Sequence, residues 1–333
     1  MIRRPAAAVG NNTGTALPSR RPRFTHPPFS GRVLAMYTIL GQLFAVLTAA
    51  CWAQNSLTYS AVGKRVGSPT VTHIRLWLAV PMILLVHLIF TGTLLPAGLP
   101  FGAYIFLGAS GFVGFCLADL LIFRAFVEIG ARETMVIMTM SPIFSAVLSW
   151  LLLGEKLLPL QIAGILGTVG GVSWVIIAEN RRHRSNTERN PKGVAFALAG
   201  ALTQAGGMIL ARRGLDFDVH PVSANVVRIT AGLVGLVVYA LLRRQLVPDF
   251  RKMTDRRSLL LLTLAAFIGP VLGIILTLYA LSWAPVGIVT ALMQITPIML
   301  LPVDRFYYKK HIPAGAVLGT FTALAGATLL FVV

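Results

Sequence analysis

The sequence is 333 residues long, with 56% hydrophobic residues, 12% charged residues and a mean hydropathy of +0.77. A soluble protein of this length does not have so apolar a composition, so the chain is expected to lie in a membrane. The formal net charge of +18 raises the alternative of nucleic-acid binding. However, the basic residues lie in loops and in the amino-terminal tail, and no basic face interleaved with aromatics is found outside the apolar segments. The charge is therefore assigned to loops beside anionic lipid, and nucleic acid is not expected as a partner.

Residues 1–35 are rich in proline, glycine and arginine and have no hydrophobic periodicity, which predicts a disordered basic tail. Among the loops, the odd-numbered ones are the more basic, which would place them in the cytoplasm and both termini outside. The arginines of the tail argue for the opposite orientation. Translation from Met36 would remove this conflict, so the sequence leaves both the true start and the orientation open.

Ten apolar runs follow the tail, each long enough for a bilayer-spanning helix of about 20 residues. The predicted spans are 37–60, 70–90, 101–123, 131–153, 158–178, 193–211, 221–242, 258–280, 286–303 and 312–333. No other segment is long enough for a soluble catalytic domain. The chain is therefore predicted to be an all-α, polytopic membrane protein, divided by a polar linker at 179–192 into halves of five spans each, 36–178 and 193–333.

The two halves repeat one hydrophobic pattern. When Ala125–Gly171 is laid over Ala280–Gly326 without gaps, Pro142 meets Pro297 and glycines meet glycines near the end of both stretches. Because each half has an odd number of spans, the second half must enter the membrane with the opposite polarity. The sequence therefore predicts an inverted repeat, which is the usual construction of carriers that alternate between two open sides.

These stretches resemble the repeated unit of EamA-type members of the drug/metabolite transporter superfamily. The resemblance covers 37–333 and is carried by Arg75 of span two and by three segments: ADLLIFRAFVEIGA (118–131), SPIFSAVLSWLLLGEKLLPLQIAGILGTVGG (141–171) and TPIMLLPVDRFYYKKHIPAGAVLGT (296–320). The second half departs from the family pattern, because Lys309-Lys310 stands where Gly-Glu is usual. The resemblance implies a ten-helix carrier, in which spans one and six line a central cavity. We expect spans three, four, eight and nine to complete the lining.

Charged residues inside the spans are the first candidates for function, because each costs at least ~2.5–3.5 kcal/mol on insertion scales. Asp119 is the only acidic residue well inside a predicted span. Removal from water favours the protonated form of a carboxyl group, so Asp119 is a candidate for proton coupling, with a structural ion pair to Arg75 or Arg124 as the alternative. Arg75 and Arg228 could bind a carboxylate or phosphate of the substrate, with anchoring at the membrane interface as the alternative.

Pro142 and Pro297 are expected to interrupt spans four and nine and to free backbone carbonyls at matched depths. Matched interruptions are typical of the central site of a carrier, whereas helix bending without ligand contact is the alternative. The remaining candidates for a substrate-facing role are polar or aromatic residues of spans one, four, six, eight and nine: Trp52, Gln54, Asn55, Thr139, Ser141, Gln204, Tyr279, Gln294 and Thr296. The alternative is hydrogen bonding between helices for the amides and interface anchoring for Tyr279.

Motifs for nucleotide hydrolysis, metal-dependent hydrolysis and dithiol chemistry are absent from the sequence, and Cys51 and Cys116 both fall inside apolar spans. No cofactor or metal ion is therefore expected. The sequence predicts a secondary transporter, not an enzyme, that exports an amino acid or related metabolite by alternating access with proton coupling. A non-transporting scaffold or sensor and an intramembrane enzyme are the alternatives. The expected location is a bacterial inner membrane, and the expected partners are the metabolite, the lipid bilayer and protons, with a homodimer left open.

Overall fold

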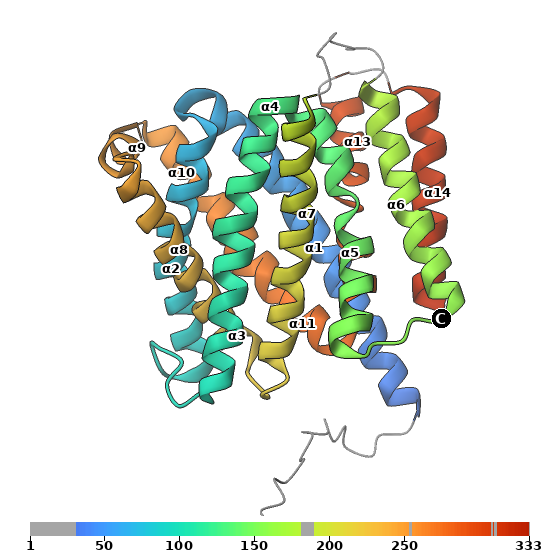
Figure 1. The fold of residues 1–333 in the computed structure, drawn as a ribbon, viewed down its shortest axis with the longest axis horizontal. Coiled ribbons are helices and arrows are strands. Elements are labelled where there is room, and N and C mark those ends of the chain that lie inside the picture. The colour runs from blue at the N-terminus through green and yellow to red at the C-terminus, as the bar shows by residue number, and fades with distance from the viewer. Residues whose placement is uncertain (1–30, 181–189, 253–254, 308, 310–311, 333) are drawn as a thin grey trace, which may run out of the picture.

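The computed structural model describes residues 31–180, 190–252, 255–307, 309 and 312–332, and these residues form a bundle of helices (Figure 1). Ten segments of the described chain are long and apolar enough to cross a membrane: Met36–Gly63, Thr70–Thr91, Phe101–Ile129, Thr134–Leu153, Pro159–Ala178, Pro191–Leu215, Pro221–Leu242, Arg256–Trp283, Val286–Val303 and Ala314–Phe331. Each overlaps one predicted span, so the prediction of an all-α, ten-span membrane protein is confirmed.

The first repeat contains α1 (Gly31–Val66), α2 (Ser68–Thr91), α3 (Phe101–Gly111), η1 (Phe112–Leu117), α4 (Ala118–Met138), α5 (Ser141–Leu148), η2 (Ser149–Leu153) and α6 (Pro159–Asn180). The second contains α7 (Pro191–Leu215), α8 (Pro221–Leu242), α9 (Leu246–Lys252), α10 (Arg256–Ala266), η4 (Phe267–Gly273), α11 (Ile274–Trp283), α12 (Val286–Met293), α13 (Thr296–Phe306) and α14 (Ala314–Val332). The η segments are π-helical and lie within or at the end of longer helices. Residues 1–30 of the predicted tail and 181–189 of the predicted linker lie outside the described residues, and α1 already begins at Gly31.

Element boundaries repeat at the interval found in the sequence. The π-helical segments η1 and η4 begin at Phe112 and Phe267, and the helices α5 and α13 begin at Ser141 and Thr296, 155 positions apart in both cases. Figure 1 shows α1 and α7 starting at opposite edges of the bundle and running in opposite directions. The two repeats are therefore inverted relative to each other, as the odd number of spans requires.

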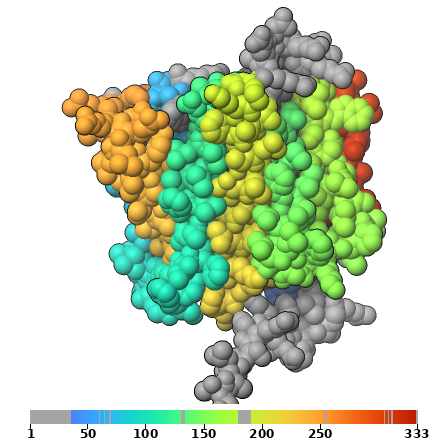
Figure 2. All heavy atoms as spheres, in the orientation of Figure 1, coloured from blue at the N-terminus to red at the C-terminus, as the bar shows by residue number. Residues whose placement is uncertain are grey.

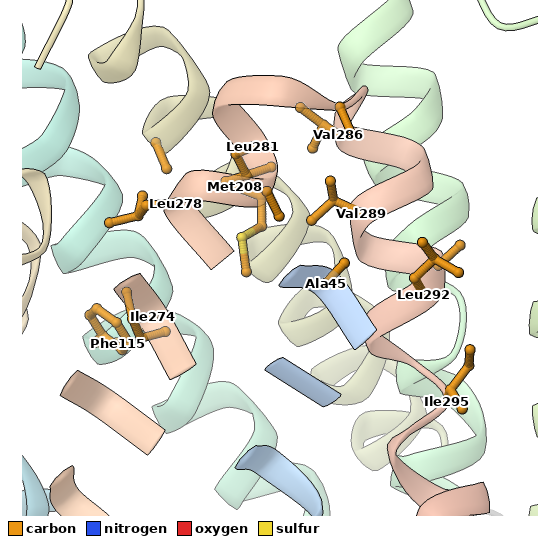
Figure 3. Packing of buried hydrophobic residues seen from close by; sticks show 14 of the residues in the cluster. Ala45, Phe115, Met208, Ile274, Leu278, Leu281, Val286, Val289, Leu292 and Ile295 are labelled. Atoms are coloured by element: carbon orange, nitrogen blue, oxygen red, sulfur yellow. The ribbon is translucent and has the colours of Figure 1, made fainter. Parts of the chain in front are cut away.

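The buried core lies where the two repeats meet. Figure 3 shows Phe115 of η1 beside Ile274 of α11, and Met208 of α7 and Val289 and Leu292 of α12 belong to the same buried cluster. The outer surface is also apolar: Val127 and Leu242, for example, are 80% exposed. A soluble protein rarely exposes so much contiguous apolar surface, whereas a bilayer covers it.

The last helices of the two repeats, α6 and α14, pack side by side at one end of the bundle, away from the middle (Figure 1). Glycines at their interface leave so little room that an added Cβ atom on Gly171 would lie 2.6 Å from the carbonyl oxygen of Gly319. Lipid tails are as apolar as leucine, so membrane helices associate by close packing of this kind rather than by exclusion of apolar surface from water. This pair therefore forms part of the scaffold that holds the repeats together.

Candidate functional site

A cavity of about 350 Å³ lies between the two repeats. Figure 2 shows the face on which α7 lies between α3–α4 and α5; these helices, together with others from both halves, enclose the cavity. Its lining contains the predicted residues Trp52, Arg75, Asp119, Ser141, Pro142, Gln204, Gln294, Thr296 and Pro297. The spans expected to line the cavity all contribute, and spans two and seven add one arginine each.

A larger hollow of about 920 Å³ lies beside α8. Its lining is mostly apolar and includes Val234, Val238 and Leu242, which are at least half exposed on the outer surface of the bundle. No charged side chain of the described residues lines it. A lateral apolar depression of this kind is a surface for lipid chains, so the smaller cavity is the candidate site.

Asp119 and Arg75 form an ion pair in the cavity. An Nη2–H of Arg75 donates to the Asp119 carboxylate, and the two side chains are 19% (Asp119) and 11% (Arg75) exposed. The Arg75 guanidinium also lies 5.5 Å from the centre of the Tyr59 ring, in cation–π range. Arg124 pairs instead with Glu128, at 2.8 Å. The ion pair predicted as an alternative for Asp119 is thus formed with Arg75, at a position that faces the cavity.

Arg228 is the second arginine of the cavity, and it is only 2% exposed. Its guanidinium lies 5.3 Å from the centre of the Phe115 ring. The backbone of Arg228 is held against span three, because an added Cβ atom on Gly111 would lie 2.0 Å from the Arg228 carbonyl oxygen. The interpretation of Arg228 as an anchor at the membrane interface is therefore wrong: its side chain is enclosed within the bundle.

Both interrupted spans break at the cavity. The helix α4 ends at Met138 and α5 begins at Ser141, while α12 ends at Met293 and α13 begins at Thr296. In each case proline is the second residue of the new helix, where its missing N–H costs nothing. The Gln294 side chain, at the break in span nine, donates to the carbonyl oxygen of Met138 at 3.0 Å. A side chain at one break therefore satisfies a backbone carbonyl at the other break.

Two predicted residues of α1 lie away from the cavity lining. The exposed Gln54 amide donates to the Thr58 hydroxyl one turn along the same helix, at 3.0 Å. Asn55 is fully buried against η4, where an added Cβ atom on Gly269 would lie 1.6 Å from the Asn55 amide nitrogen. Asn55 therefore packs between helices, but neither its amide nitrogen nor its amide oxygen has a hydrogen-bond partner among the described residues, so the hydrogen bonding between helices expected as the alternative is not found for it.

Thr139 and Tyr279 also lie outside the lining. The Thr139 hydroxyl lies 2.8 Å from the Ser173 hydroxyl of α6, and Tyr279 packs in an aromatic cluster with Trp283 and Phe44. The cavity instead contains residues that the sequence interpretation passed over: Ser56, Phe123, Phe126, Met135 and Thr290. Phe123 and Phe126 follow Asp119 by four and seven positions, so a helical period counted from Asp119 would have found them.

Beyond the cavity, a polar cluster ties the repeats together where α7 and α11 end. The Glu155 carboxylate of the first repeat accepts the Val286 N–H of the second at 3.0 Å and lies 3.8 Å from the Arg212 side chain. Arg212 also donates to the Leu281 carbonyl oxygen at 2.5 Å, and the Asp216 carboxylate lies 4.0 Å from the Arg212 side chain. Figure 1 shows α7 and α11 ending at the same edge of the bundle. These contacts link the two repeats at that edge.

A ten-helix inverted repeat with a charged cavity between its halves is the architecture of a membrane transporter. The model of the EamA-like transporter family matches residues 39–177 and 191–332, so the chain belongs to this family and is a multi-pass membrane protein. No curated protein matches the sequence. The fold is similar to a solved structure described only as the crystal structure of a protein, with a TM-score of 0.69 and 16% sequence identity over 87% of this chain and 94% of that chain.

Proposed function

We propose that this protein is a secondary transporter of the bacterial inner membrane that exports a small metabolite, an amino acid or a related compound, by alternating access coupled to protons. The observation that supports the proposal most directly is the cavity between the inverted repeats, which contains a carboxylate and both helix breaks. A non-transporting scaffold does not require a buried ion pair that faces a cavity. An intramembrane enzyme would require a second catalytic group beside Asp119, and no other carboxylate of the described chain lines the cavity.

Asp119 and Arg75 supply a means of coupling. When the Asp119 carboxylate takes up a proton, it loses its negative charge and the Coulombic part of its interaction with Arg75. Arg75 then keeps a positive charge without its partner, which changes the charge that a substrate meets in the cavity. Release of the proton on the other side of the membrane restores the pair. The proton thus changes the affinity of the cavity for a charged substrate, and by linkage the substrate changes the affinity for the proton, which is what coupled transport requires.

The function is tested by transport in a defined system. Metabolites that change between cells lacking and cells overproducing the protein are first identified, and each is then supplied to vesicles that contain the purified full-length chain. We expect at least one of them to cross faster than in protein-free vesicles, and an imposed pH gradient to accelerate its flux. Absence of flux for every such metabolite would reject the transporter, and chemical conversion of one of them would favour the enzyme.

Alternating access also requires the cluster around Glu155 to separate. Burial raises the pKa of the Glu155 carboxyl above its ordinary value, since desolvation outweighs the lowering effects of the Val286 N–H and of Arg212, and Asp216 raises it further. The closed contact therefore binds a proton more tightly than an open arrangement in which Glu155 is in water. Linkage then makes the contact most stable at low pH, and its stability falls as the pH rises through the raised pKa.

We expect the protection of the Val286 amide against hydrogen exchange, corrected for the intrinsic rate, to increase as the pH falls from about 8 to about 5. Glu155→Gln, which mimics the protonated acid, should be protected at every pH. The Ala284 amide is an internal control, because it donates to the backbone of Ala280 at 2.9 Å. A wild-type protein whose Val286 protection does not respond to pH would contradict this account of the closed end.

A further inference from the structure

The charge balance of the cavity is positive. Among the described residues that line it, the charged side chains are Arg75, Asp119 and Arg228. Arg75 and Asp119 neutralise each other in their ion pair. Arg228 remains as a single cation that this pair does not balance, and its side chain is only 2% exposed.

The Arg228 guanidinium has hydrogen-bond donors that no described residue accepts. Its Nε and Nη1 groups are buried and make no hydrogen bond within the described chain, and no carboxylate of the described residues lies within 4 Å of its guanidinium. The contact with the Phe115 ring accounts for one face of the guanidinium only. A buried cation without an anion is strongly disfavoured, and a planar guanidinium presents parallel donors that match the two oxygens of a carboxylate. An anion that enters the cavity would supply such a partner.

The other lining residues indicate the chemical character of the rest of such an anion. Phe123 and Phe126 meet edge to face, with ring centroids 5.8 Å apart, and Trp52 and Met208 add further apolar surface. The Asp119 carboxylate is already engaged by Arg75, so the described lining offers an ammonium group no free acid. A phosphate monoester brings about −1.5 to −2 charges, which exceeds the single uncompensated cation.

We propose that Arg228 binds the carboxylate of a small monoanionic substrate whose apolar body lies against the aromatic side chains of the cavity. This proposal rests on the transport function proposed above and specifies its substrate class. Within the class proposed above, an amino acid or a related compound, it selects a related organic acid over the amino acid itself, because the described lining has no second carboxylate to pair with the ammonium group of a zwitterion. It also excludes organic cations, which Arg228 would repel.

The test is a binding series on the purified full-length chain in lipid nanodiscs. The probes share one phenyl group and differ in their charge: 3-phenylpropionate, its neutral amide, 2-phenylethylamine, phenylalanine and phenyl phosphate. We expect 3-phenylpropionate to bind at least about tenfold more tightly than each of the other four, the difference of a charge-assisted hydrogen bond. Equal or tighter binding of the amide, the amine, phenylalanine or phenyl phosphate would overturn the proposed class. The same would follow if sodium chloride alone produced the response.

Two variants assign the effect to Arg228. Arg228→Gln should lose the preference for the acid over the amide, whereas Arg228→Lys should keep the preference with weaker binding. Arg243→Gln is the matched control, since Arg243 is an exposed arginine at the end of the same helix. Unliganded Arg228→Gln should be at least as resistant to thermal unfolding as the wild type, because it removes an unpaired buried charge. Lower thermal resistance, or retention of the acid preference in this variant, would show that Arg228 has a structural role instead.

The binding and flux experiments test the anion site and the transport function separately. Binding of 3-phenylpropionate without flux of any metabolite would reject the carrier and leave an anion site. Proton-driven flux of a cation or of a neutral compound, with no binding of the acid, would leave the carrier and reject the anion site.

Discussion

Asp119→Asn is expected to abolish proton-driven transport while the protein remains folded. Asparagine has the shape of aspartate, and its carbonyl oxygen can still accept the hydrogen bond from Arg75, but it cannot take up or release a proton. Breaking a buried ion pair typically costs about 3–5 kcal/mol. The cost here should be smaller, because both side chains reach the cavity, with exposures of 11% and 19%, and because the hydrogen bond survives. In vesicles, flux driven by a pH gradient should fall to the protein-free background.

The decisive comparison is between net flux and exchange. Exchange of substrate across the membrane at equal pH needs no net proton movement, so Asp119→Asn should still catalyse it. Glu128→Gln provides the matched control, because Glu128 is an acid of the same helix that pairs with Arg124 and accepts from Asn190 at 2.7 Å, outside the cavity lining. If Asp119→Asn responds to the gradient as the wild type does, proton coupling at this residue is wrong. Loss of exchange as well, in a folded variant, would assign Asp119 to substrate binding.

Much of the fold could be predicted because the bilayer imposes simple demands on a sequence. Each crossing needs about 20 apolar residues, and backbone groups must be satisfied within a helix, so the spans can be read from composition alone. The interruptions could also be predicted, since Pro142 and Pro297 cannot continue a helix from the preceding turn. The gapless pairing of the two halves gave the position of matching boundaries, as the starts of α5 and α13 show.

The lining of the cavity was harder to predict, because lipid and protein core are both apolar. A helix in water shows its buried face by amphipathicity, whereas α1 is apolar on most sides and gives no such signal. Trp52 and Ser56 are one turn apart and line the cavity, while the neighbouring Gln54 and Asn55 point elsewhere. Polarity alone could not separate these residues.

The isolation of Arg228 was likewise beyond the sequence. Its neighbours in space include residues of α3 and η1, which are distant along the chain, and whether an acid lies among them depends on how the helices pack. The ion pair between Arg75 and Asp119 has the same origin, since 44 positions separate the two residues. A list of charged residues within spans names the candidates, but it does not say which cation is left without a partner.

The second large effect is a loss of stability that we expect when one methyl group is added at the contact between α6 and α14. Gly171→Ala adds one Cβ atom that would lie 2.3 Å from the Ala323 backbone nitrogen and 2.6 Å from the Gly319 carbonyl oxygen. These are backbone atoms of α14, so no side chain can turn aside, and the helices must separate. Overpacking of this kind costs about 1–3 kcal/mol. The neighbouring Gly170 has no atom within 4 Å of its added Cβ, so Gly170→Ala adds only the helix preference of alanine.

The two alanine variants should therefore change stability in opposite directions. Alanine is favoured over glycine in a helix by about 1 kcal/mol, so Gly170→Ala should raise the midpoint of thermal unfolding in detergent, whereas Gly171→Ala should lower it. Neither residue lines the cavity, so the fraction of Gly171→Ala protein that stays folded should bind substrate with unchanged affinity. Equal shifts for the two variants would mean that α6 and α14 do not pack through Gly171. A change in substrate affinity would mean that this helix pair moves with the cavity rather than supporting it.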